Sequence, residues 1–506
     1  MSRKRVLIFV VAYNAERFIA SVISRIPESL LQDERLELEV LVIDDSSKDE
    51  TFQRGHEFRQ TYTHCPITLL KNPKNLGYGG NQKLGYRYAI DNKFDYVVLL
   101  HGDGQYAPEE LPKLLAPLLN DQADAVFGSR MLTSFGALKG GMPMYKFIGN
   151  RILTTLQNWL VGTRLSEWHS GYRLYSCAAL KRIPFESNSN NFDFDTDIIV
   201  QLHDARMRIA ELPIPTYYGD EICHVNGVSY GLKILLSCFM YRIQRLSIFY
   251  NPKFDTGQAN EQYEVKFDFV SSHSLALNAV QQQDELLILG CGPLETVTPY
   301  FAKTNGAVSV IDQYVGDDLR HRSKQALAVD LDQFRLSDGA VAGEFSKVLA
   351  LDIVEHLKSP EAFLEDIRNA PATRESLLVL TTPNIAFCLI RASLLLGAFN
   401  YGKRGILDRT HTRLFTFRSL RRLFEQSGYQ VEKMRGIPVP FPLAVGRNVL
   451  GEFLLSLNEL AIKILPTVFS YQIYVEARPL PTTELLLERA HVNTRELEQK
   501  LKVSSS

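Results

Sequence analysis

Acidic and amide side chains stand directly after two apolar runs in the first half of the sequence. Asp44 and Asp45 follow LEVLVI, and Asp103 and Gln105 follow YVVLLHG. Carboxylate and amide oxygens are the ligands that hard divalent cations prefer. Asp103 and Gln105 are two residues apart, so in an extended turn their side chains lie on the same side. The spacing predicts a site at which Mg²⁺ or Mn²⁺ bridges the protein and a diphosphate.

The ends of the first two apolar runs also offer contacts for a nucleoside. Tyr13 and Asn14 place a ring and an amide there, and Asp44 and Asp45 add carboxylates. Carboxylates accept hydrogen bonds well from base N–H groups and ribose hydroxyls. The alternative is that Asp44 and Asp45 cap the helix that follows. The local sequence leaves both interpretations open.

A glycine-rich turn, NPKNLGYGGN, precedes a predicted helix. Asn75, Gly77 and Gly79 lie in this turn, where backbone N–H groups could face a diphosphate. A helix terminus stabilises an anion by roughly 0.3–1 kcal/mol, whereas a bound metal contributes several kcal/mol. We therefore expect the cation at Asp103 to dominate and the helix to assist.

Short apolar segments that alternate with amphipathic helical segments must position these side chains. Five such segments occur within residues 5–130: RVLIFVVAY, LEVLVIDDS, ITLLKN, YVVLLHGD and ADAVFGSR. A second series of five follows residue 284: ELLILGCG, GAVSVIDQY, QALAVDL, SKVLALDIVEHL and SLLVLTTPN. This alternation is typical of doubly wound, mostly parallel sheets, which bind ligands at the carboxyl ends of their strands. The predicted fold class is α/β with two doubly wound domains.

The length and a polar segment suggest where these domains end. A chain of 506 residues is too long for one hydrophobic core. Periodicity is lost after Tyr250, in NPKFDTGQANEQYEVKFD. We predict a first domain over 1–250, a linker over 251–266, a second domain over 267–480 and a charged tail over 481–506.

Composition indicates a globular protein of a reducing compartment. Hydrophobic residues make up 45% and charged residues 22%, and the net charge of −1 argues against nucleic acid as a partner. The six cysteines are scattered without CxxC spacing, which favours a cytoplasmic location. The apolar run 232–250 is interrupted by Lys233, Arg242 and Arg245, so we expect a packed helix there. The alternative is a helix in peripheral contact with the inner face of a membrane.

Six segments in the first half resemble family 2 glycosyltransferases, and within them the dolichyl- or polyprenyl-phosphate sugar synthases. In order they are VVAYNAERF, VIDDSSKDET, NLGYGGN, HGDGQYAPEEL, FGSR and HSGYRLYS. The resemblance spans residues 4–235. It implies a GT-A fold, a nucleotide-sugar donor, a divalent metal and inversion at the anomeric carbon.

The resemblance also assigns roles to individual residues. Asp44 and Asp45 would meet the base and the ribose, and Asp103 and Gln105 the metal and the diphosphate. Arg130 and Arg173 would face donor or acceptor phosphate, for which a planar guanidinium is suited. For Arg173 the alternative is an ion pair with a neighbouring carboxylate.

The sequence departs from the family pattern at two places. His101 stands where the family motif DxD begins with an acid. The loop TYYGDEICHVNGVSYG offers Glu221 and His224 where the lipid-phosphate branch often has an arginine. The second departure argues against a polyprenyl-phosphate acceptor.

Acidic residues in NNFDFDTDIIVQL are candidates for a general base. An alcohol acceptor needs such a base, and Asp195 and Asp197 would share one face of an extended segment. If the segment is helical, one of its acids is an N-cap. Both interpretations stay open, with Asp195 as the preferred base.

The second half contains a glycine-rich turn between two apolar runs, ELLILGCGPLE and VSVIDQY. Asp312 lies twenty residues after Gly292, a spacing at which an acid can bind the ribose of NAD or of S-adenosylmethionine. A close-packed turn without ligand is the alternative.

Three later segments resemble class I S-adenosylmethionine-dependent methyltransferases, which have a Rossmann-like fold. They are LALDIVEHLKSPEAFLEDIR, SLLVLTTPN and DRTHTRLFTFRSLRRLFEQSGYQVE, and the resemblance spans 267–478. It implies that Gly290 and Gly292 line S-adenosylmethionine, that Asp312 binds its ribose and that Asp330 meets its adenine. Asp352 to His356 would lie beside the reacting methyl group.

Two features of this half qualify that resemblance. Pro293 and Leu294 stand where the family has a third small residue, which favours a scaffold domain as the alternative to an active one. Glu355 and His356 could serve as bases for an oxygen acceptor, or His356 could be a buried core histidine.

Together these features predict an inverting sugar transferase with a glycan or lipid-linked acceptor. The second domain would methylate an intermediate of the same glycan pathway. The alternatives are an active transferase with a non-catalytic second domain, or a nucleotide-binding scaffold of a glycan assembly complex.

Overall fold

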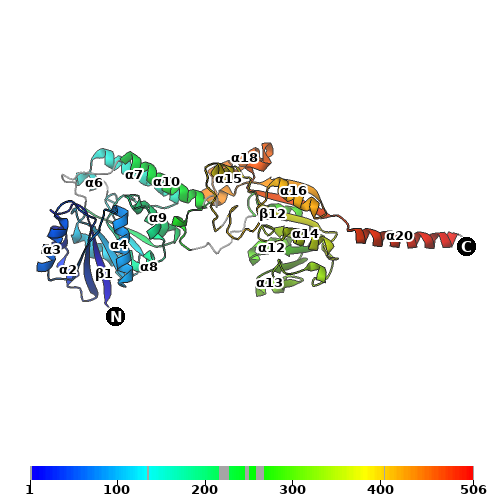
Figure 1. Ribbon diagram of the computed structural model, residues 1–506, viewed down its shortest axis with the longest axis horizontal. Coiled ribbons are helices and arrows are strands. Elements are labelled where there is room, and N and C mark those ends of the chain that lie inside the picture. The colour runs from blue at the N-terminus through cyan, green and yellow to red at the C-terminus, as the bar shows by residue number, and fades with distance from the viewer. Residues whose placement is uncertain are drawn as a thin grey trace. The chain divides into compact units, whose positions relative to one another are not determined.

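The computed structural model describes residues 3–133, 136–215, 227–245, 250–257, 267–403 and 405–504. The chain divides into two compact units (Figure 1). The first comprises Met1–Gln244 with Asn251–Glu261, and the second Arg245–Tyr250 with Gln262–Ser506.

A seven-stranded sheet with the order β3-β2-β1-β4-β6-β5-β7 forms the centre of the first unit. All pairings are parallel except those of β6, which runs antiparallel to β4 and β5. The strands are β1 Lys4–Ala12, β2 Leu36–Asp44, β3 Ile67–Lys71, β4 Tyr96–His101, β5 Ala125–Ser129, β6 Arg173–Ser176 and β7 Ile209–Pro213.

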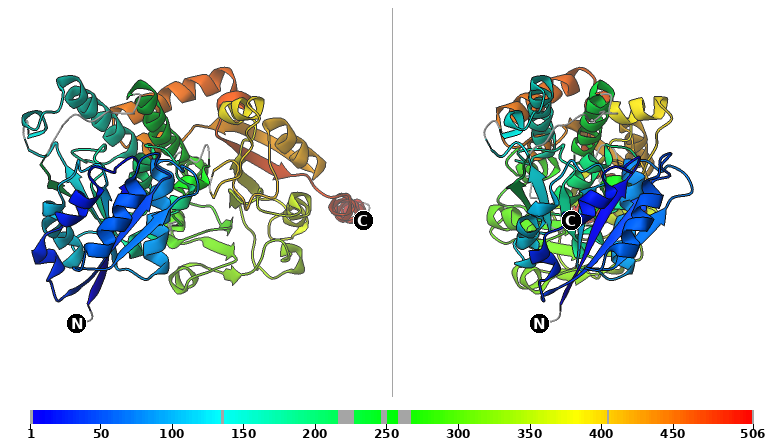
Figure 2. Two further views of the ribbon diagram at one scale, coloured as in Figure 1. Left: turned by 60° about the vertical axis from the view of Figure 1, so that its left-hand side comes forward. Right: turned by 90° about the vertical axis from the view of Figure 1, so that its left-hand side faces the viewer.

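Helices cover both faces of this sheet, with α2 and α3 on one side and α4 and α9 on the other (Figures 1 and 2). The helices are α1 Ile19–Ser24, α2 Glu28–Leu31, α3 Thr51–Thr61, α4 Tyr78–Asp91, α5 Leu111–Leu119, α6 Gly136–Lys139, α7 Met144–Val161, α8 Cys177–Leu180, α9 Phe194–Asp204 and α10 Gly227–Arg245. Short 3₁₀ helices are η1 Pro108–Glu110, η2 Phe185–Ser187 and η3 Pro252–Phe254.

Strand β1 shows why its sequence is a continuous apolar run. Leu7 and Phe9 enter one hydrophobic core, while Val6, Ile8 and Val10 enter the core on the opposite face. All five side chains are 0% exposed. A strand that is covered on both faces needs apolar residues at every position.

Strand register brings the predicted site residues to one edge of the first sheet. Ala12 of β1 pairs with Asp44 of β2, and Val11 of β1 pairs with His101 of β4. The residues that follow these strands therefore share the carboxyl edge, as the sequence predicted.

A second seven-stranded sheet has the order β10-β9-β8-β11-β12-β14-β13. It is parallel from β10 to β12, and β14 is antiparallel to β12 and to β13. The strands are β8 Leu286–Leu289, β9 Val308–Asp312, β10 Ala326–Ala328, β11 Lys347–Leu351, β12 Leu377–Pro383, β13 Tyr429–Ile437 and β14 Gln472–Pro479.

The helices of the second unit complete an α/β architecture with a core on each face of the sheet. They are α11 Ser272–Ala279, α12 Leu294–Lys303, α13 Asp317–Arg322, η4 Leu336–Asp338, α14 Pro360–Asn369, α15 Cys388–Leu395, α16 Phe417–Gln426, α17 Phe441–Val445, α18 Val449–Ile464, α19 Pro466–Phe469 and α20 Thr483–Ser504. The predicted fold class, two doubly wound α/β domains, is confirmed. Within the described residues, no helix has both the length and the apolar character required to cross a membrane.

Candidate functional site

Asp44 and Asp45 organise loops at the carboxyl edge of the first sheet. Asp44 is fully buried, and its carboxylate accepts hydrogen bonds from the amide of Ser47 at 2.8 Å and from the Ser47 hydroxyl. Lys71 Nζ lies 3.3 Å from the other carboxylate oxygen. Helix α3 has Glu50 at its N-cap position, without a side-chain cap bond. The alternative that these acids cap the next helix is therefore wrong, because Asp44 closes the turn before it.

Asp45 ties the glycine-rich turn to the end of β2. Its carboxylate accepts from Asn72 Nδ2 at 2.7 Å and from the amides of Leu76 and Gly77, both at 2.9 Å. Asn75 Nδ2 donates to the Asp45 carbonyl at 3.1 Å. Three protein donors thus fix this carboxylate.

The amides at the start of α4 have protein acceptors, which corrects the expectation that they face a diphosphate. Gly79 and Gly80 donate to the carbonyl of Asn190 at 2.9 and 3.2 Å. A Cβ on Gly79 would lie 2.4 Å from the carbonyl oxygen of Ser189. Gly77 has φ +82° and donates to the side chains of Asp45 and Asn75. These glycines allow a distant loop to pack against the helix start.

Tyr13 and Asn14 follow β1 at the same edge. Tyr13 is 47% exposed, so its ring is accessible to a ligand. Asn14 adopts φ +51°, and its Oδ1 accepts from the amide of Lys48 at 3.1 Å. Their contact with a base stays a prediction.

The end of β4 carries a cluster of polar side chains around His101. His101 Nε2 lies 3.1 Å from the Tyr78 hydroxyl, which lies 3.2 Å from Asp195 Oδ2. The hydroxyl has one hydrogen, and a carboxylate is the stronger acceptor, so Tyr78 donates to Asp195 and His101 Nε2–H donates to Tyr78. His101 Nδ1 then lacks a hydrogen and can accept one.

Burial and charge set the protonation of this cluster. Burial lowers the pKa of His101 more than the nearby carboxylates of Asp103 and Asp195 raise it, so the imidazole is neutral at pH 7. Burial, followed by the charge of Asp195, raises the pKa of Tyr78 well above its usual value. Tyr78 therefore keeps its proton.

Asp103 is half-buried in the turn that follows His101. Its Oδ1 accepts from the Gln105 amide at 3.1 Å. A carboxylate has about four lone-pair positions, so Asp103 keeps acceptor capacity for a cation. Gln105 is half-buried as well.

The segment with Asp195 and Asp197 is helical, so the extended alternative is wrong. Asp193 is at the N-cap position of α9 but makes no side-chain cap bond. Asp195 accepts from Tyr78 and from Gln82 Nε2, and Arg173 Nη2 lies 3.8 Å from it. Two positions along a helix are about 200° apart, so the two acids cannot share a face.

Asp197 is a structural ion-pair partner, which corrects its predicted catalytic role. It is fully buried and accepts from Lys253 Nζ at 2.7 Å, from Ser237 Oγ at 2.6 Å and from the Ser189 amide at 3.1 Å. These donors connect α9 to α10 and η3. Its carboxylate stabilises the packing of the first unit.

The two arginines expected to face phosphate have protein partners instead. Arg173 is 1% exposed, and its three nitrogens donate to the carbonyls of Ser170, Asp195 and Trp168 at 2.8–2.9 Å. Its guanidinium also lies over the ring of Phe127. With Asp195 nearby, this geometry favours the ion-pair alternative.

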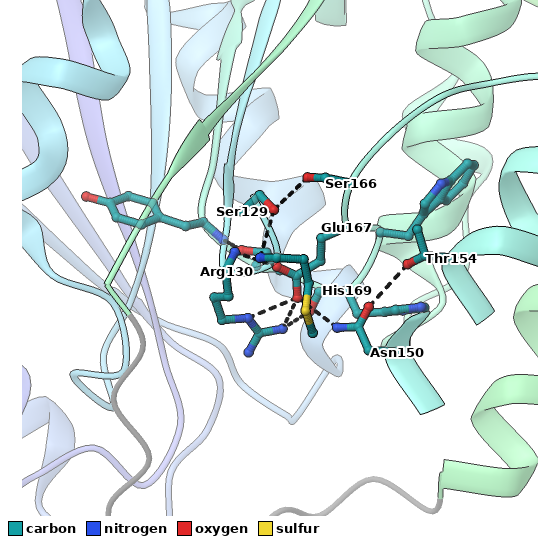
Figure 3. A network of polar contacts seen from close by, with 12 residues as sticks. Ser129, Arg130, Asn150, Thr154, Ser166, Glu167 and His169 are labelled. Carbon is teal, nitrogen blue, oxygen red and sulfur yellow. Dashed lines mark hydrogen bonds and ion pairs between the residues drawn. The ribbon is translucent and has the colours of Figure 1, made fainter. Parts of the chain in front are cut away.

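Arg130 forms an ion pair with buried Glu167 (Figure 3). Its Nε donates to Glu167 at 2.9 Å and its Nη2 to the carbonyl of His169 at 3.1 Å. Asn150 Nδ2 also donates to Glu167, at 2.9 Å. Burial would raise the pKa of Glu167, but Arg130 lowers it overall, so the pair is charged. The sequence did not predict this network because its two charged partners, Arg130 and Glu167, are 37 residues apart in the chain.

Tyr78, Gln82 and Glu167 are the residues that the sequence did not single out. Tyr78 lies within the motif NLGYGGN, and Gln82 is the residue that directly follows this motif. The hydroxyl of Tyr78, inside this motif, is the one feature of the sequence that could have indicated its role. The loop residues Glu221 and His224 lie outside the described residues.

In the second unit, Asp312 holds the glycine-rich turn. Its carboxylate accepts from the amides of Gly292 at 2.9 Å and Tyr314 at 3.0 Å. Each oxygen keeps a lone pair for a ribose hydroxyl. Gly292 has φ +62°, and Pro293 is the N-cap residue of α12 with φ −70°. Pro293 and Leu294 thus start a helix without distortion.

Gly290 has a packing role beside its predicted ligand contact. Its φ is +70°, and a Cβ would lie 2.0 Å from Ile353 Cδ1. The glycine lets the loop after β11 approach β8. This contact supports the close-packed turn as one reason for the motif.

Asp330 and Asp352 differ in their surroundings. Asp330 is exposed and accepts from the Asp332 amide at 3.0 Å. Asp352 adopts φ +55° and accepts from Thr381 Oγ1 at 2.8 Å and Gln472 Nε2 at 2.9 Å. Their contacts with a cofactor stay predictions.

Glu355 and His356 follow Asp352. Glu355 is buried, and burial first, then the charge of Asp352, raises its pKa well above the usual value. His356 is exposed. The alternative that His356 is a core histidine is therefore wrong.

Comparisons with known proteins identify both halves. Residues 7–184 match the family model "Glycosyl transferase family 2", and residues 261–434 match the model "Methyltransferase domain". The chain is 26% identical to the UDP-N-acetylglucosamine–dolichyl-phosphate N-acetylglucosaminyltransferase of Methanococcus voltae, over 49% of this chain and 99% of that protein. It is 28% identical to the undecaprenyl-phosphate mannosyltransferase of Micrococcus luteus, over 42% of this chain and 82% of that protein.

Among solved structures, the chain matches glucosyl-3-phosphoglycerate synthase from Mycobacterium tuberculosis in complex with UDP. That match has 17% identity and a TM-score of 0.36, and covers 47% of this chain and 80% of that one. Each of the two family matches covers most strands of one of the two sheets whose carboxyl edge carries candidate site residues. Residues 7–184 are therefore a family 2 glycosyltransferase domain, residues 261–434 are a methyltransferase domain, and the chain is an enzyme that resembles the polyprenyl-phosphate sugar transferases.

Proposed function

We propose that the first domain transfers a sugar from a nucleotide-sugar donor, with inversion, to a lipid-linked acceptor. The observation that carries this proposal is the position of Asp103. Its carboxylate lies at the exit of β4, level with the exits of β1 and β2, and next to His101. Tyr13, Asn14, Asp44 and Asp45 surround the same edge.

A divalent cation fits the donors present at this edge. Asp103 and Gln105 supply oxygen ligands, and His101 Nδ1 can replace the acid that opens the usual DxD motif. Mg²⁺ and Mn²⁺ suit such oxygen-rich sets. When bound, the metal would neutralise charge on the departing diphosphate. Asp44 and Asp45 hold the loops against which base and ribose would lie.

The acceptor is proposed to be a polyprenyl phosphate because the relatives' names specify dolichyl and undecaprenyl phosphate. A phosphate acceptor is already ionised and needs no base, whereas an alcohol acceptor would use Asp195. The acceptor can therefore be distinguished by the Asp195→Asn variant. Retained turnover points to a phosphate, and a loss of about 10²–10⁴-fold points to a hydroxyl.

The proposed function is tested by a screen of donors with Mn²⁺ present. Release of nucleoside diphosphate is measured for each nucleotide sugar, with and without a short-chain polyprenyl phosphate. We expect release with one sugar class that rises when the lipid is added. The absence of release with every donor, in protein that binds Mn²⁺, would contradict the proposal.

Two helices of the first unit support contact with a lipid surface. Apolar side chains stand out along one stripe of α7 and another of α10: Tyr145 72%, Ile148 49%, Ile152 55%, Trp159 62%, Val228 76%, Leu232 67% and Leu236 59% exposed. The helices are neighbours, since a Cβ on Gly231 would lie 3.6 Å from Leu153. Both helices contain Lys or Arg and neither contains Asp or Glu. We infer that these stripes lie against an anionic membrane, where a polyprenyl phosphate resides.

Replacing Ile152 and Trp159 together by serine is expected to weaken binding to vesicles that contain anionic lipid by at least about tenfold. Each large apolar side chain contributes roughly 1.5 kcal/mol or more when buried. Sedimentation with vesicles measures the effect. Leu84→Ser, at a site on α4 that is 40% exposed, is the matched control. Equal sedimentation of the double variant and the control would remove the membrane proposal.

We propose that the second domain binds S-adenosylmethionine and methylates an intermediate of the same glycan pathway. The hydrogen bond between Asp312 and Gly292 supports it, because it places a carboxylate beside the glycine-rich turn. Gly290, Asp330 and Asp352 lie on loops that follow β8, β10 and β11, at the same sheet edge. We also propose that the first domain comprises residues 1–250 and the second 267–480, with 251–266 as the linker between them and 481–506 as a C-terminal tail.

S-adenosylmethionine is expected to raise the melting temperature of the chain. A ligand at 100 times its dissociation constant adds about 2.7 kcal/mol of stability. Asp312→Ala should remove the shift, whereas Asp317→Ala, on exposed α13, should retain it. A wild-type protein without any shift would favour the scaffold alternative.

A further inference from the structure

Three side chains with metal-binding atoms converge in the second unit. The ligand atoms of Glu355, His356 and His411 all lie within 4.8 Å of one another. Glu355 and His356 follow β11, whereas His411 comes from the segment before α16. The group thus unites a strand exit with a loop more than fifty residues further along the chain.

The rings of His356 and His411 are arranged as two ligands of one ion would be. Their centroids are 4.8 Å apart, and their planes make an angle of 75°. At metal–nitrogen distances of about 2.1 Å, tetrahedral ligand atoms lie about 3.4 Å apart. The side chains need to close by little more than about 1 Å, and His356, which is exposed, has room to move.

A backbone carbonyl fixes the tautomer of His411. Its Nδ1 lies 3.0 Å from the carbonyl oxygen of Ile406. A carbonyl can only accept, so Nδ1 carries the hydrogen and Nε2 keeps its lone pair. Histidines that bind metals typically donate their second ring nitrogen to such an acceptor. His411 is therefore prepared as a ligand through Nε2.

Further hydrogen bonds hold the two segments together. The amides of Thr412 and Arg413 donate to the carbonyl of Glu355 at 2.8 and 3.1 Å. Thr412 Oγ1 donates to the carbonyl of Leu357 at 2.6 Å. These bonds place His411 next to Glu355 independently of any contact between their side chains.

The carboxylate of Glu355 is oriented and removed from water. Its residue is 2% exposed, and Thr382 Oγ1 donates to Oε2 at 3.0 Å. Arg413 points its guanidinium to Glu361, 3.7 Å away. A hydrogen bond from one hydroxyl offsets the cost of burying a carboxylate less than an opposite charge does. A metal at this position would offset that cost.

We propose that Glu355, His356 and His411 bind a divalent transition-metal ion such as Zn²⁺, Mn²⁺ or Fe²⁺. Two imidazoles and one carboxylate suit this class, whereas Mg²⁺ and Ca²⁺ prefer oxygen ligands only. Three protein ligands leave at least one coordination position open. If the second domain transfers a methyl group from S-adenosylmethionine, as proposed above, this position can take an oxygen of the methyl acceptor beside Asp352.

Cobalt binding tests the site without reference to activity. Untagged full-length protein is stripped with a chelator and titrated with Co²⁺, which replaces Zn²⁺ and absorbs visible light when bound by nitrogen ligands. We expect one such Co²⁺ at this site, apart from any ion that His101 and Asp103 bind in the first domain. His356→Ala and His411→Ala should each weaken binding by about 100-fold or more, and Thr382→Val by about 10–100-fold, because ligand orientation contributes on that scale.

Two controls separate this site from other histidines and from the first domain. His321→Ala, at an exposed position of α13, should leave the cobalt spectrum and affinity unchanged, and Asp103→Ala should leave the Co²⁺ at Glu355, His356 and His411 in place. His356 is exposed, so its variant should fold normally. Unchanged affinity in His356→Ala and His411→Ala, or a wild-type chain that takes up no Co²⁺, would overturn the proposal.

The same samples distinguish this inference from the methyltransferase proposal. Calorimetric titration with S-adenosylmethionine reports on the Asp312 site alone when metal is absent. Cofactor binding without Co²⁺ binding would reject the metal site and leave the proposed function intact. Co²⁺ binding without cofactor binding would reject the proposed S-adenosylmethionine site and leave the metal site intact.

Discussion

Asp103→Ala is expected to lower metal-dependent release of nucleoside diphosphate by about 10³-fold, with the fold intact. A bound metal contributes several kcal/mol to stabilising the leaving group, and about 4 kcal/mol corresponds to that factor. Asp103 is half-buried in a turn, and its hydrogen bond to the Gln105 amide is local. Its removal should therefore spare the core.

The measurement is steady-state release of nucleoside diphosphate over a titration of Mn²⁺. Circular dichroism and the melting temperature verify the fold of the variant. Asp91→Ala, which removes an exposed acid on α4, is the matched control and should keep full activity. Turnover of Asp103→Ala within fivefold of the wild type would remove the assignment of the metal to this edge.

Asp197→Ala is expected to destabilise the first unit by about 3–5 kcal/mol. Removing one partner of a buried ion pair leaves the other charge uncompensated, and this cost is typical for such pairs. Asp197 is 0% exposed, and Lys253 Nζ lies 2.7 Å from it. The amide of Ser189 and the hydroxyl of Ser237 also lose their acceptor.

Hydrogen exchange of peptides from α9 measures this loss within the full chain. A two-domain chain need not unfold in one step, so a local measurement is preferable to a single melting temperature. The pair Asp197→Leu with Lys253→Met should recover a large part of the stability, because apolar replacement of both partners is often neutral. A loss below about 1 kcal/mol for Asp197→Ala would instead return Asp197 to the catalytic candidates.

Much of the fold was readable from local sequence. The ten apolar runs named from the sequence are β1 to β5 and β8 to β12. Continuous apolar runs are diagnostic because strands of parallel sheets are buried on both faces. The strands that escaped prediction include β6, β13 and β14, all antiparallel to their neighbours. The sequences of β13 and β14 mix polar and apolar residues, as partly covered strands do, whereas β6 is a buried strand of only four residues.

The candidate site was predicted in its position but not in its internal contacts. Asp44, Asp103 and Asp312 lie at strand exits, as their spacing indicated. The glycine-rich turn, by contrast, uses its amides to bind Asp45 and Asn190. That arrangement depends on a loop that the turn sequence does not contain.

The sequence by itself determined ten strands of the two sheets and the chemistry at their carboxyl edges, since hydrophobic periodicity acts over a few residues. Only the tertiary structure decided which charges are paired. Arg130 and Glu167 are 37 residues apart in the chain, and Asp197 and Lys253 are 56 apart. His411 reaches Glu355 in the same way. The partner of a buried charge is chosen by packing between distant elements, where desolvation makes pairing necessary.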